Sequence, residues 1–234
     1  LSEPPATRPK LVTLYFEHLD SAGHRHGPHA PETRETLQRM DRAIGRLVDG
    51  LADRGMADQV DLIVVSDHGM AEVPPGQVIA VEDMVDPDHV ELVSAGQSVG
   101  FAPHPGHEAA AEARLLGRHG RYECWRRGEL PARWDYGSHP RVPPIVCQMD
   151  EGWDALPREY AARAASRTRG SHGFDPALPS MRTIFIADGP SFADGAVLPP
   201  IDNVDVYPLL TRLLGVEPAP NDGNPEALLP ALRN

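Results

Sequence analysis

Five acidic and imidazole side chains stand beside hydrophobic stretches of the sequence, and together they could bind metal ions. One pair lies in EHLDSAGHRHGP after the apolar residues 10–16, and a second pair lies in SDHGM after residues 60–65. A fifth side chain lies in RGSHGFDP, ahead of the apolar residues 183–187. The five are Asp20, His24, Asp67, His68 and His172. Carboxylate and imidazole groups are ligands of Zn²⁺, and α/β proteins build sites in loops near strand ends. The pattern therefore favours metal-assisted chemistry.

Each motif taken alone has a plainer interpretation. Asp20 and His24 could form an Asx-turn with a solvent-exposed histidine, and Asp67 could be the capping residue of a turn. The motifs are stronger together, because all three are expected at one sheet edge. Five ligands exceed the needs of one tetrahedral zinc with an open position, so two Zn²⁺ ions are the more natural count, with Mn²⁺ or Fe as alternatives. The other histidines are expected to be surface residues, including His26, His29, His89, His104, His107, His119 and His139.

Apolar periodicity predicts the elements that would position these side chains. Residues 10–16 (KLVTLYF) and 60–65 (VDLIVV) have the composition of buried strands, and residues 33–54 have the three- and four-residue spacing of an amphipathic helix. Strand, helix and strand in this order predict a right-handed crossover in a parallel sheet, with Asp20 and His24 in the loop after the first strand. Residues 183–187 return to the strand pattern. A last helix is expected from a cap at Asp202 or Asn203 to Gly215.

Between residues 74 and 153 the pattern changes to short strand candidates at 78–81, 90–93 and 98–101, a modest helix at 108–116, and two strand-like stretches rich in Trp, Tyr and Pro. This predicts an inserted, partly antiparallel subdomain within one domain that covers residues 1–234. The two strand-like stretches, RYECWR and PPIVCQM, contain Cys124 and Cys147 and could pair as neighbours. A disulfide and two buried thiols both fit these positions.

Composition excludes several classes of partner. The chain has 234 residues, with 41% hydrophobic and 24% charged residues, which is ordinary for a globular protein. Its formal net charge of −12 argues against a nucleic-acid polymer, whose backbone is bound by Lys and Arg, but does not exclude a small phosphorylated substrate. No apolar run reaches the length of about eighteen residues that a membrane span needs, so no membrane is expected among the partners.

Five segments of the sequence resemble the nucleotide pyrophosphatase/phosphodiesterase family of the alkaline phosphatase superfamily. They are DSAGHRHGP, VVSDHGM, RGSHGFDP, PARWDYGSHPRVPPIVCQMDEGW and NVDVYPLLTRLLGVEPAPNDG, in the family's order, and they are most similar to bacterial members. The resemblance implies an α/β, alkaline-phosphatase-like fold, with a mostly parallel sheet flanked by helices and a small, partly antiparallel insertion. It also implies two Zn²⁺ ions, one bound by Asp20, His24 and His172 and the other by Asp67 and His68 among its ligands.

The resemblance further implies hydrolysis of nucleotide-type phosphodiesters or pyrophosphates through a covalent phospho-threonine. In the family, the nucleophilic threonine and the aspartate that completes the second zinc site precede the strand that corresponds to residues 10–16. No threonine here has the matching context, so we expect no catalytic nucleophile in this chain. We expect the N-terminal part of the fold to be absent, with an open apolar sheet edge. A second chain carrying that part is then an implied partner, beside the small substrate. The implied location is periplasmic or secreted.

Two rival interpretations stay open at the level of sequence. Another hydrolase of the superfamily, such as a phosphonoacetate hydrolase or a phosphoglycerate mutase, would share the metal motifs, although the Trp/Tyr/Pro-rich residues 131–153 favour the phosphodiesterase branch. A non-catalytic metal-binding fragment or partner chain would share them too. A third alternative is a structural α/β domain in which the Asp and His residues have no metal-binding role.

Overall fold

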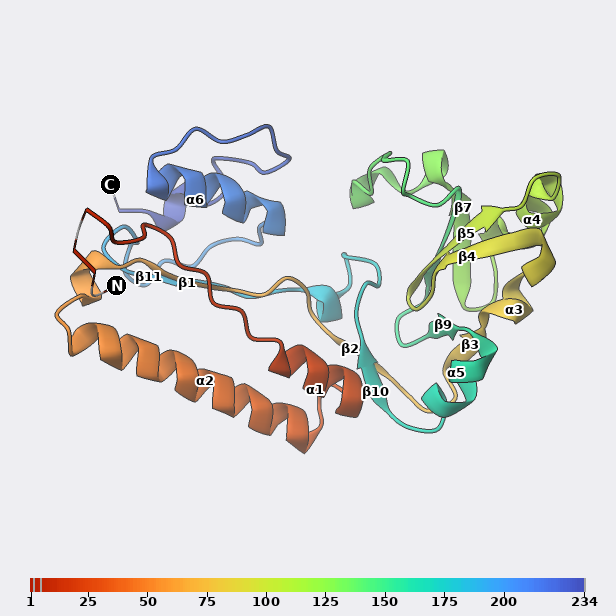
Figure 1. Ribbon diagram of the computed structural model, residues 1–234, viewed down its shortest axis with the longest axis horizontal. Coiled ribbons are helices and arrows are strands. Elements are labelled where there is room, and N and C mark those ends of the chain that lie inside the picture. The colour runs from red at the N-terminus through yellow and green to blue at the C-terminus, as the bar shows by residue number, and fades with distance from the viewer. Residues whose placement is uncertain (2, 5, 234) are drawn as a thin grey trace. The chain divides into compact units, whose positions relative to one another are not determined.

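The computed structural model describes residues 1, 3–4 and 6–233 (Figure 1). These residues form two compact units. Unit 1 comprises Leu1–Phe16, Met40–Asp67 and Thr183–Asn234, and unit 2 comprises Glu17–Arg39 and His68–Arg182. The long helix α2 (Pro31–Ala52) contributes its first part to unit 2 and the rest to unit 1. Within the described ranges, no helix is both long and apolar enough to cross a membrane.

Unit 2 contains a five-stranded antiparallel sheet that lies inside the segment 74–153. Its strands are β4 (Val90–Ser94), β5 (Ser98–Pro103), β8 (Ile145–Met149), β7 (Tyr122–Arg126) and β6 (Gly117–Arg118), in that spatial order. The central strands β5 and β8 are buried along most of their length, and α4 (Glu108–Leu115) adds Ala111 and Leu115 to the core beneath the sheet. The antiparallel pairing predicted for this segment is therefore present.

A disulfide joins the two cysteines across neighbouring strands of this sheet. Cys124 on β7 is the register partner of Cys147 on β8, and the two sulfurs are bonded. Both residues are buried in the main core, beside side chains such as Phe101, Ile145 and Met149. Of the two states that fit the sequence, the structure therefore has the disulfide.

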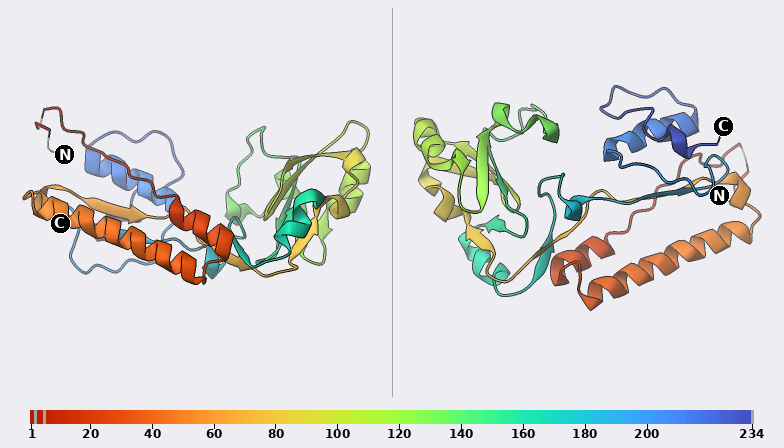
Figure 2. Two further views of the ribbon diagram at one scale, coloured as in Figure 1. Left: turned by 60° about the horizontal axis from the view of Figure 1, so that its bottom comes forward. Right: turned by 180° about the vertical axis from the view of Figure 1, so that it is seen from behind.

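Shorter ladders connect the rest of unit 2. Strand β2 (Ala71–Val73) pairs antiparallel with β10 (Arg169–Ser171), and β3 (Val78–Ala80) pairs parallel with β9 (Asp154–Leu156). The short helices α3 (Val81–Met84) and α5 (Arg158–Ala164) follow β3 and β9 directly in the chain. Helix α1 (His18–His26) lies side by side with β10, as Figures 1 and 2 both show.

Unit 1 is built on one antiparallel strand pair and a helix. Strand β1 (Leu62–Val65) pairs with β11 (Phe185–Asp188), and α6 (Val206–Leu214) ends at Gly215, whose φ of 64° suits a glycine. The backbone N–H of Asp202 donates to the Asp205 carboxylate ahead of α6, which confirms the predicted cap region. A small core of buried side chains closes the unit, and its members are Phe192, Leu209, Leu228 and Ala231.

The α/β class is confirmed, but three sequence expectations were wrong. Residues 10–16 are not a buried strand: they pair with no strand among the described residues, and side chains such as Leu14 and Tyr15 are exposed. Asp20 and His24 lie on the helix α1 and not in a loop. Within the described ranges, the strands pair mostly antiparallel, with β3–β9 the parallel exception. Apolar composition indicates a strand, but the pairing partner decides whether a strand forms and in which direction it runs.

Candidate metal centre

Helix α1 presents Asp20 and His24 on one face. The two residues are four apart, a spacing that places side chains one above the other on a helix. The helix ends at Gly27, whose backbone N–H donates to the carbonyl oxygen of Gly23 and whose φ of 92° disfavours residues with a side chain. The rigid backbone of a helix therefore fixes the separation of a carboxylate and an imidazole.

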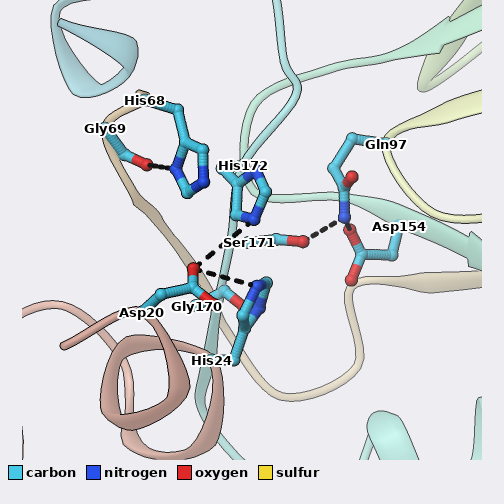
Figure 3. A network of polar contacts seen from close by, with 9 residues as sticks. All are labelled: Asp20, His24, His68, Gly69, Gln97, Asp154, Gly170, Ser171 and His172. Atoms are coloured by element: carbon cyan, nitrogen blue, oxygen red, sulfur yellow. Dashed lines mark hydrogen bonds and ion pairs between the residues drawn. The ribbon is translucent and has the colours of Figure 1, made fainter. Parts of the chain in front are cut away.

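The antiparallel pairing of β2 with β10 brings two further histidines to one place. Ser171, the last residue of β10, is the register partner of Ala71, the first residue of β2. The segment that enters β2 and the segment that leaves β10 therefore lie at the same end of this ladder. His68 is on the first segment and His172 is on the second, and their rings stack with centroids 3.4 Å apart (Figure 3).

Glycines allow α1 to approach β10 closely. A Cβ atom on Gly170 would lie 2.5 Å from the carbonyl oxygen of Gly23, which is closer than any real contact of this kind. The same Cβ would lie 2.8 Å from the sulfur of Met70. Without a side chain at position 170, the helix lies against the strand, and Asp20 and His24 face the end of β10.

Asp20, His24 and His172 form a trio whose ligand atoms all lie within 4.8 Å of one another. The Asp20 Oδ1 atom is 3.4 Å from His24 Nε2 and 3.5 Å from His172 Nε2 (Figure 3). Ligand atoms about 2.0–2.1 Å from a tetrahedral zinc are about 3.3 Å apart, so these separations fit a shared ion. The three side chains are 37%, 41% and 30% exposed, which leaves the trio accessible from solvent.

Hydrogen bonds fix which ring nitrogen each histidine presents. His24 Nδ1 is 2.9 Å from the Gly170 carbonyl oxygen, and His68 Nδ1 is 2.9 Å from the Gly69 carbonyl oxygen. A carbonyl can only accept, so Nδ1 carries the proton in both rings, and the Nε2 atom of a neutral ring is then the metal-ligating lone pair. Asp20 Oδ1 is buried and accepts no hydrogen bond from the described residues. A cation between these atoms would satisfy the oxygen and both nitrogens, so the donor set fits zinc.

Asp67 belongs to unit 1, whereas the other four predicted ligands belong to unit 2. Asp67 is exposed, and its backbone carbonyl accepts a hydrogen bond from the Asn203 side chain at 3.2 Å. His68 touches the trio through its stacked ring, but its ligand atoms are not within the 4.8 Å cluster. Within unit 2 the structure brings together the four predicted ligands that this unit contains, three of them as one ligand set.

The histidines expected to be surface residues stay outside the trio, which is the single ligand cluster among the described residues. His89 and His107 stack on each other at a centroid distance of 4.6 Å, and His119 stacks on Tyr122. These rings make structural contacts and do not converge on a carboxylate.

Several residues around the trio were missed by sequence reasoning. Gln97 donates to Ser171 Oγ and to Asp154, and Arg169 pairs with Asp154, so a polar network adjoins the ligand strand (Figure 3). No local signal marks Gln97 or Asp154, because their partners are distant along the chain. The partners of Gln97 lie 57 and 74 residues away, and Arg169 lies 15 residues from Asp154. Only Arg169 and Ser171, both within the motif RGSHG, stood in a segment that the sequence singled out.

An ion pair holds the loop that follows His172. Arg133 donates from two nitrogens to the two carboxylate oxygens of Asp175, one of these bonds being 2.6 Å long. These hydrogen bonds hold the pKa of Asp175 below its ordinary value. The carboxylate also accepts from the backbone N–H of Ala177, so it ties the loop at two points.

Comparisons with known proteins identify relatives of this chain. Human ectonucleotide pyrophosphatase/phosphodiesterase family member 7 is 36% identical over 228 residues, which are 95% of this chain and 49% of the relative. Bovine bis(5'-adenosyl)-triphosphatase ENPP4 is 32% identical over 224 residues, with 95% of this chain and 47% of the relative covered. The chain thus spans about half the length of these curated relatives.

A solved structure and a family description complete the comparison. Murine ectonucleotide pyrophosphatase/phosphodiesterase 5 superposes with a TM-score of 0.87 at 31% sequence identity, covering 94% of this chain and 58% of that one. Residues 1–175 match the family described as type I phosphodiesterase / nucleotide pyrophosphatase. With more than half of the chain matched in sequence and nearly all of it matched in structure, the chain belongs to the type I phosphodiesterase / nucleotide pyrophosphatase family.

Proposed function

We propose that this chain supplies the metal centre for zinc-dependent hydrolysis of small nucleotide-type phosphodiesters or pyrophosphates. The observation that carries the proposal is the trio of Asp20, His24 and His172, with ligand atoms at separations that suit a tetrahedral zinc. A second zinc in the proposal takes Asp67 and His68 among its ligands. The stacked rings of His68 and His172 support it, since they place two potential ligands of different ions side by side.

The chain's own residues would bind the zinc ions and orient the ligand atoms. Zinc, when bound, supplies Lewis-acid stabilisation of phosphate oxygens and lowers the pKa of a nucleophile. Asp20 would contribute negative charge to the ion, and the Gly170 carbonyl keeps the proton of His24 on Nδ1, so that Nε2 faces Asp20. The nucleophile of the proposal is a threonine outside residues 1–234, because no threonine of this sequence has the context of the family's nucleophile.

The names of two relatives support a nucleotide substrate. The bovine relative is named as a bis(5'-adenosyl)-triphosphatase, and an inactive variant of the murine enzyme was solved in complex with AMP. We extend this nucleotide chemistry to the present chain as part of the proposal. The disulfide between Cys124 and Cys147 and the "ecto" names of the relatives support a periplasmic or secreted location, where disulfides persist.

Zinc titration of the purified chain tests the metal centre. We expect tight binding by the unmodified chain. Asp20→Ala and His172→Ala should weaken it by more than the roughly 10–100-fold that loss of an outer-shell partner costs, because each removes a direct ligand. His104→Ala is the matched control, since His104 is an exposed histidine outside the trio. Unchanged affinity in Asp20→Ala or His172→Ala would contradict the assignment.

An assay on bis-p-nitrophenyl phosphate, run on the zinc-loaded chain, tests the position of the nucleophile. We expect zinc binding without turnover, since the metal ligands are present and the threonine is not. Turnover by the chain alone that Asp20→Ala abolishes would keep the metal centre but show that the nucleophile lies within residues 1–234.

A further inference from the structure

Strand β10 leads into His172, and its side chains form hydrogen bonds and an ion pair within a buried polar network, part of which Figure 3 shows. Arg169 pairs with Asp154 of β9, and the Gln97 amide donates to Ser171 Oγ and, at 3.2 Å, to Asp154 Oδ1. Two of the three residues of β10 therefore bond through their side chains to partners that lie outside its own ladder with β2. None of these side chains belongs to the ligand trio.

The side chains of this network are buried, which restricts the positions that β10 can take. Asp154 is 1% exposed and Ser171 is 2% exposed, and the Arg169 side chain is 11% exposed. A buried carboxylate that loses its partner is strongly destabilised, so the Asp154–Arg169 pair tolerates few alternative positions of β10. A slip of one residue would also turn the side chains of β10 to the opposite face. The ion pair and the Gln97 hydrogen bonds together specify the register that places His172.

A second glutamine holds the residue on the other side of His172. Gln148 on β8 donates to the Gly173 carbonyl oxygen at 3.2 Å and to the Gln97 carbonyl oxygen at 3.0 Å. The residues before and after His172 are thus each bonded to a glutamine side chain. One glutamine precedes β5 and the other lies on β8, two strands that pair directly with each other.

We infer that Gln97, Gln148 and the Asp154–Arg169 pair are positioning residues for the metal centre, through which the five-stranded sheet fixes His172 relative to Asp20 and His24. The inference rests on the metal centre proposed above. Gln97 holds the Ser171 hydroxyl just before His172, Gln148 holds the Gly173 carbonyl just after it, and the ion pair anchors the strand. These residues touch neither metal nor substrate, so their role is expressed in ligand geometry.

The test is zinc affinity measured by chelator competition on Gln97→Ala and Gln148→Ala, with the thermal midpoint of each metal-free protein measured separately. Loss of an outer-shell hydrogen bond should weaken zinc binding by roughly 10–100-fold. Gln59→Ala is the matched control, because Gln59 also donates to a backbone carbonyl, that of Gly55 at 3.0 Å, but far from the trio in sequence and in the other unit. We expect its zinc affinity to equal that of the unmodified chain.

Cobalt substitution adds a readout that a purely structural role would not change. The visible absorption of bound Co²⁺ depends on coordination number and geometry. We expect Gln97→Ala to alter this spectrum and Gln59→Ala to leave it unchanged. If Gln97→Ala and Gln148→Ala lower only the thermal midpoint, while the folded protein keeps its zinc affinity and cobalt spectrum, the positioning role is overturned.

Asp154→Asn leaves the Arg169 charge buried without a partner, and this variant could fail to fold. The glutamine variants keep the inference testable in that case. The two proposals also fail in different ways. Equal, weak zinc binding by the unmodified chain and Asp20→Ala would overturn the metal centre and, with it, the positioning role. Tight binding that Asp20→Ala abolishes and Gln97→Ala retains would overturn the positioning role alone.

Discussion

Gly170 decides how closely the ligand helix approaches the ligand strand. The residue carries the carbonyl that orients His24, and the absence of a side chain lets Gly23 of α1 lie against it. The proposed metal centre therefore depends on a residue that has no side chain and cannot itself be a side-chain ligand. Ligand geometry is set by backbone packing as much as by the choice of ligands.

Gly170→Ala should damage stability and zinc binding together. Its Cβ would lie 2.5 Å from the Gly23 carbonyl oxygen, so α1 or β10 must move, at a cost of about 1–3 kcal/mol in the free energy of unfolding. We expect weaker zinc binding in titration and a lower urea midpoint. Gly120→Ala is the control, since a Cβ there meets no atom within 4 Å. Equal zinc affinity in the two variants would show that the close approach is unnecessary.

The pair of Arg133 and Asp175 predicts a pH dependence. The pKa of Asp175 is lowered in the folded chain, so its contribution to stability is present above the ordinary aspartate pKa, near 3.8, and is lost as pH falls through the lower folded value. Asp175→Asn should reduce the free energy of unfolding at pH 7 by less than about 1 kcal/mol, because the pair is partly exposed. Urea unfolding at several pH values should show this difference shrinking below about pH 4. A difference that grows toward acid would contradict the assignment.

At the scale of elements, one antiparallel ladder and one helix assemble the site. The ladder of β2 and β10 brings His68, in the segment before β2, beside His172, which directly follows β10, and α1 adds two ligands from a single face. Gln148 of the five-stranded sheet bonds the Gly173 carbonyl just after His172, so the rigidity of that sheet matters to the site. The disulfide between β7 and β8 is part of that rigidity.

Removing the disulfide should destabilise the five-stranded sheet. A loop with a sequence separation of 23 residues corresponds to about 3 kcal/mol of chain-entropy stabilisation. We expect the double variant Cys124→Ala, Cys147→Ala to lose roughly this amount in urea unfolding. A reductant should destabilise the unmodified chain but leave the double variant unaffected. If the reductant lowered the stability of both proteins equally, the effect would not come from this bond.

At the scale of the whole molecule, unit 1 exposes apolar side chains on a strand pair. Val65 of β1 and Ile186 of β11 are exposed, as are Leu14 and Tyr15 of the extended segment at residues 10–16. Exposed apolar strands favour association between chains. The main core lies in unit 2.

Ile186→Thr should reduce self-association without unfolding the chain. Ile186 is 59% exposed on β11, and threonine keeps the β-branched shape while adding a polar group. We expect a higher fraction of monomer in sedimentation velocity at equal concentration. Val197→Thr is the control, since Val197 is exposed but lies outside any strand. A similar gain from both variants would show that general hydrophobicity, and not the strand surface, drives association.

Prediction from sequence succeeded where the signal was local and failed where it depended on a distant partner. The helix around Leu47 and Leu51, the last helix ending at Gly215, and the strands around Cys124 and Cys147 carry their periodicity or composition within a few residues. The segment at residues 10–16 has the same apolar composition as a strand but lacks a pairing partner among the described residues. The network around Gln97 gave no signal, because hydrogen bonds across 57 and 74 residues leave no local pattern.

The sequence by itself determined which types of potential metal ligand the chain carries, because Asp and His side chains have fixed donor properties wherever they lie. It also determined the helices α2, α4 and α6 and the partly antiparallel character of residues 74–153, since hydrophobic spacing is a local property. Only the tertiary structure decided that Asp20 and His24 share a helix face, that His172 meets them at the end of β10, and that the cysteines are bonded. Those facts depend on strand register and on the close approach of Gly23 and Gly170, which are set by packing between segments far apart in the chain.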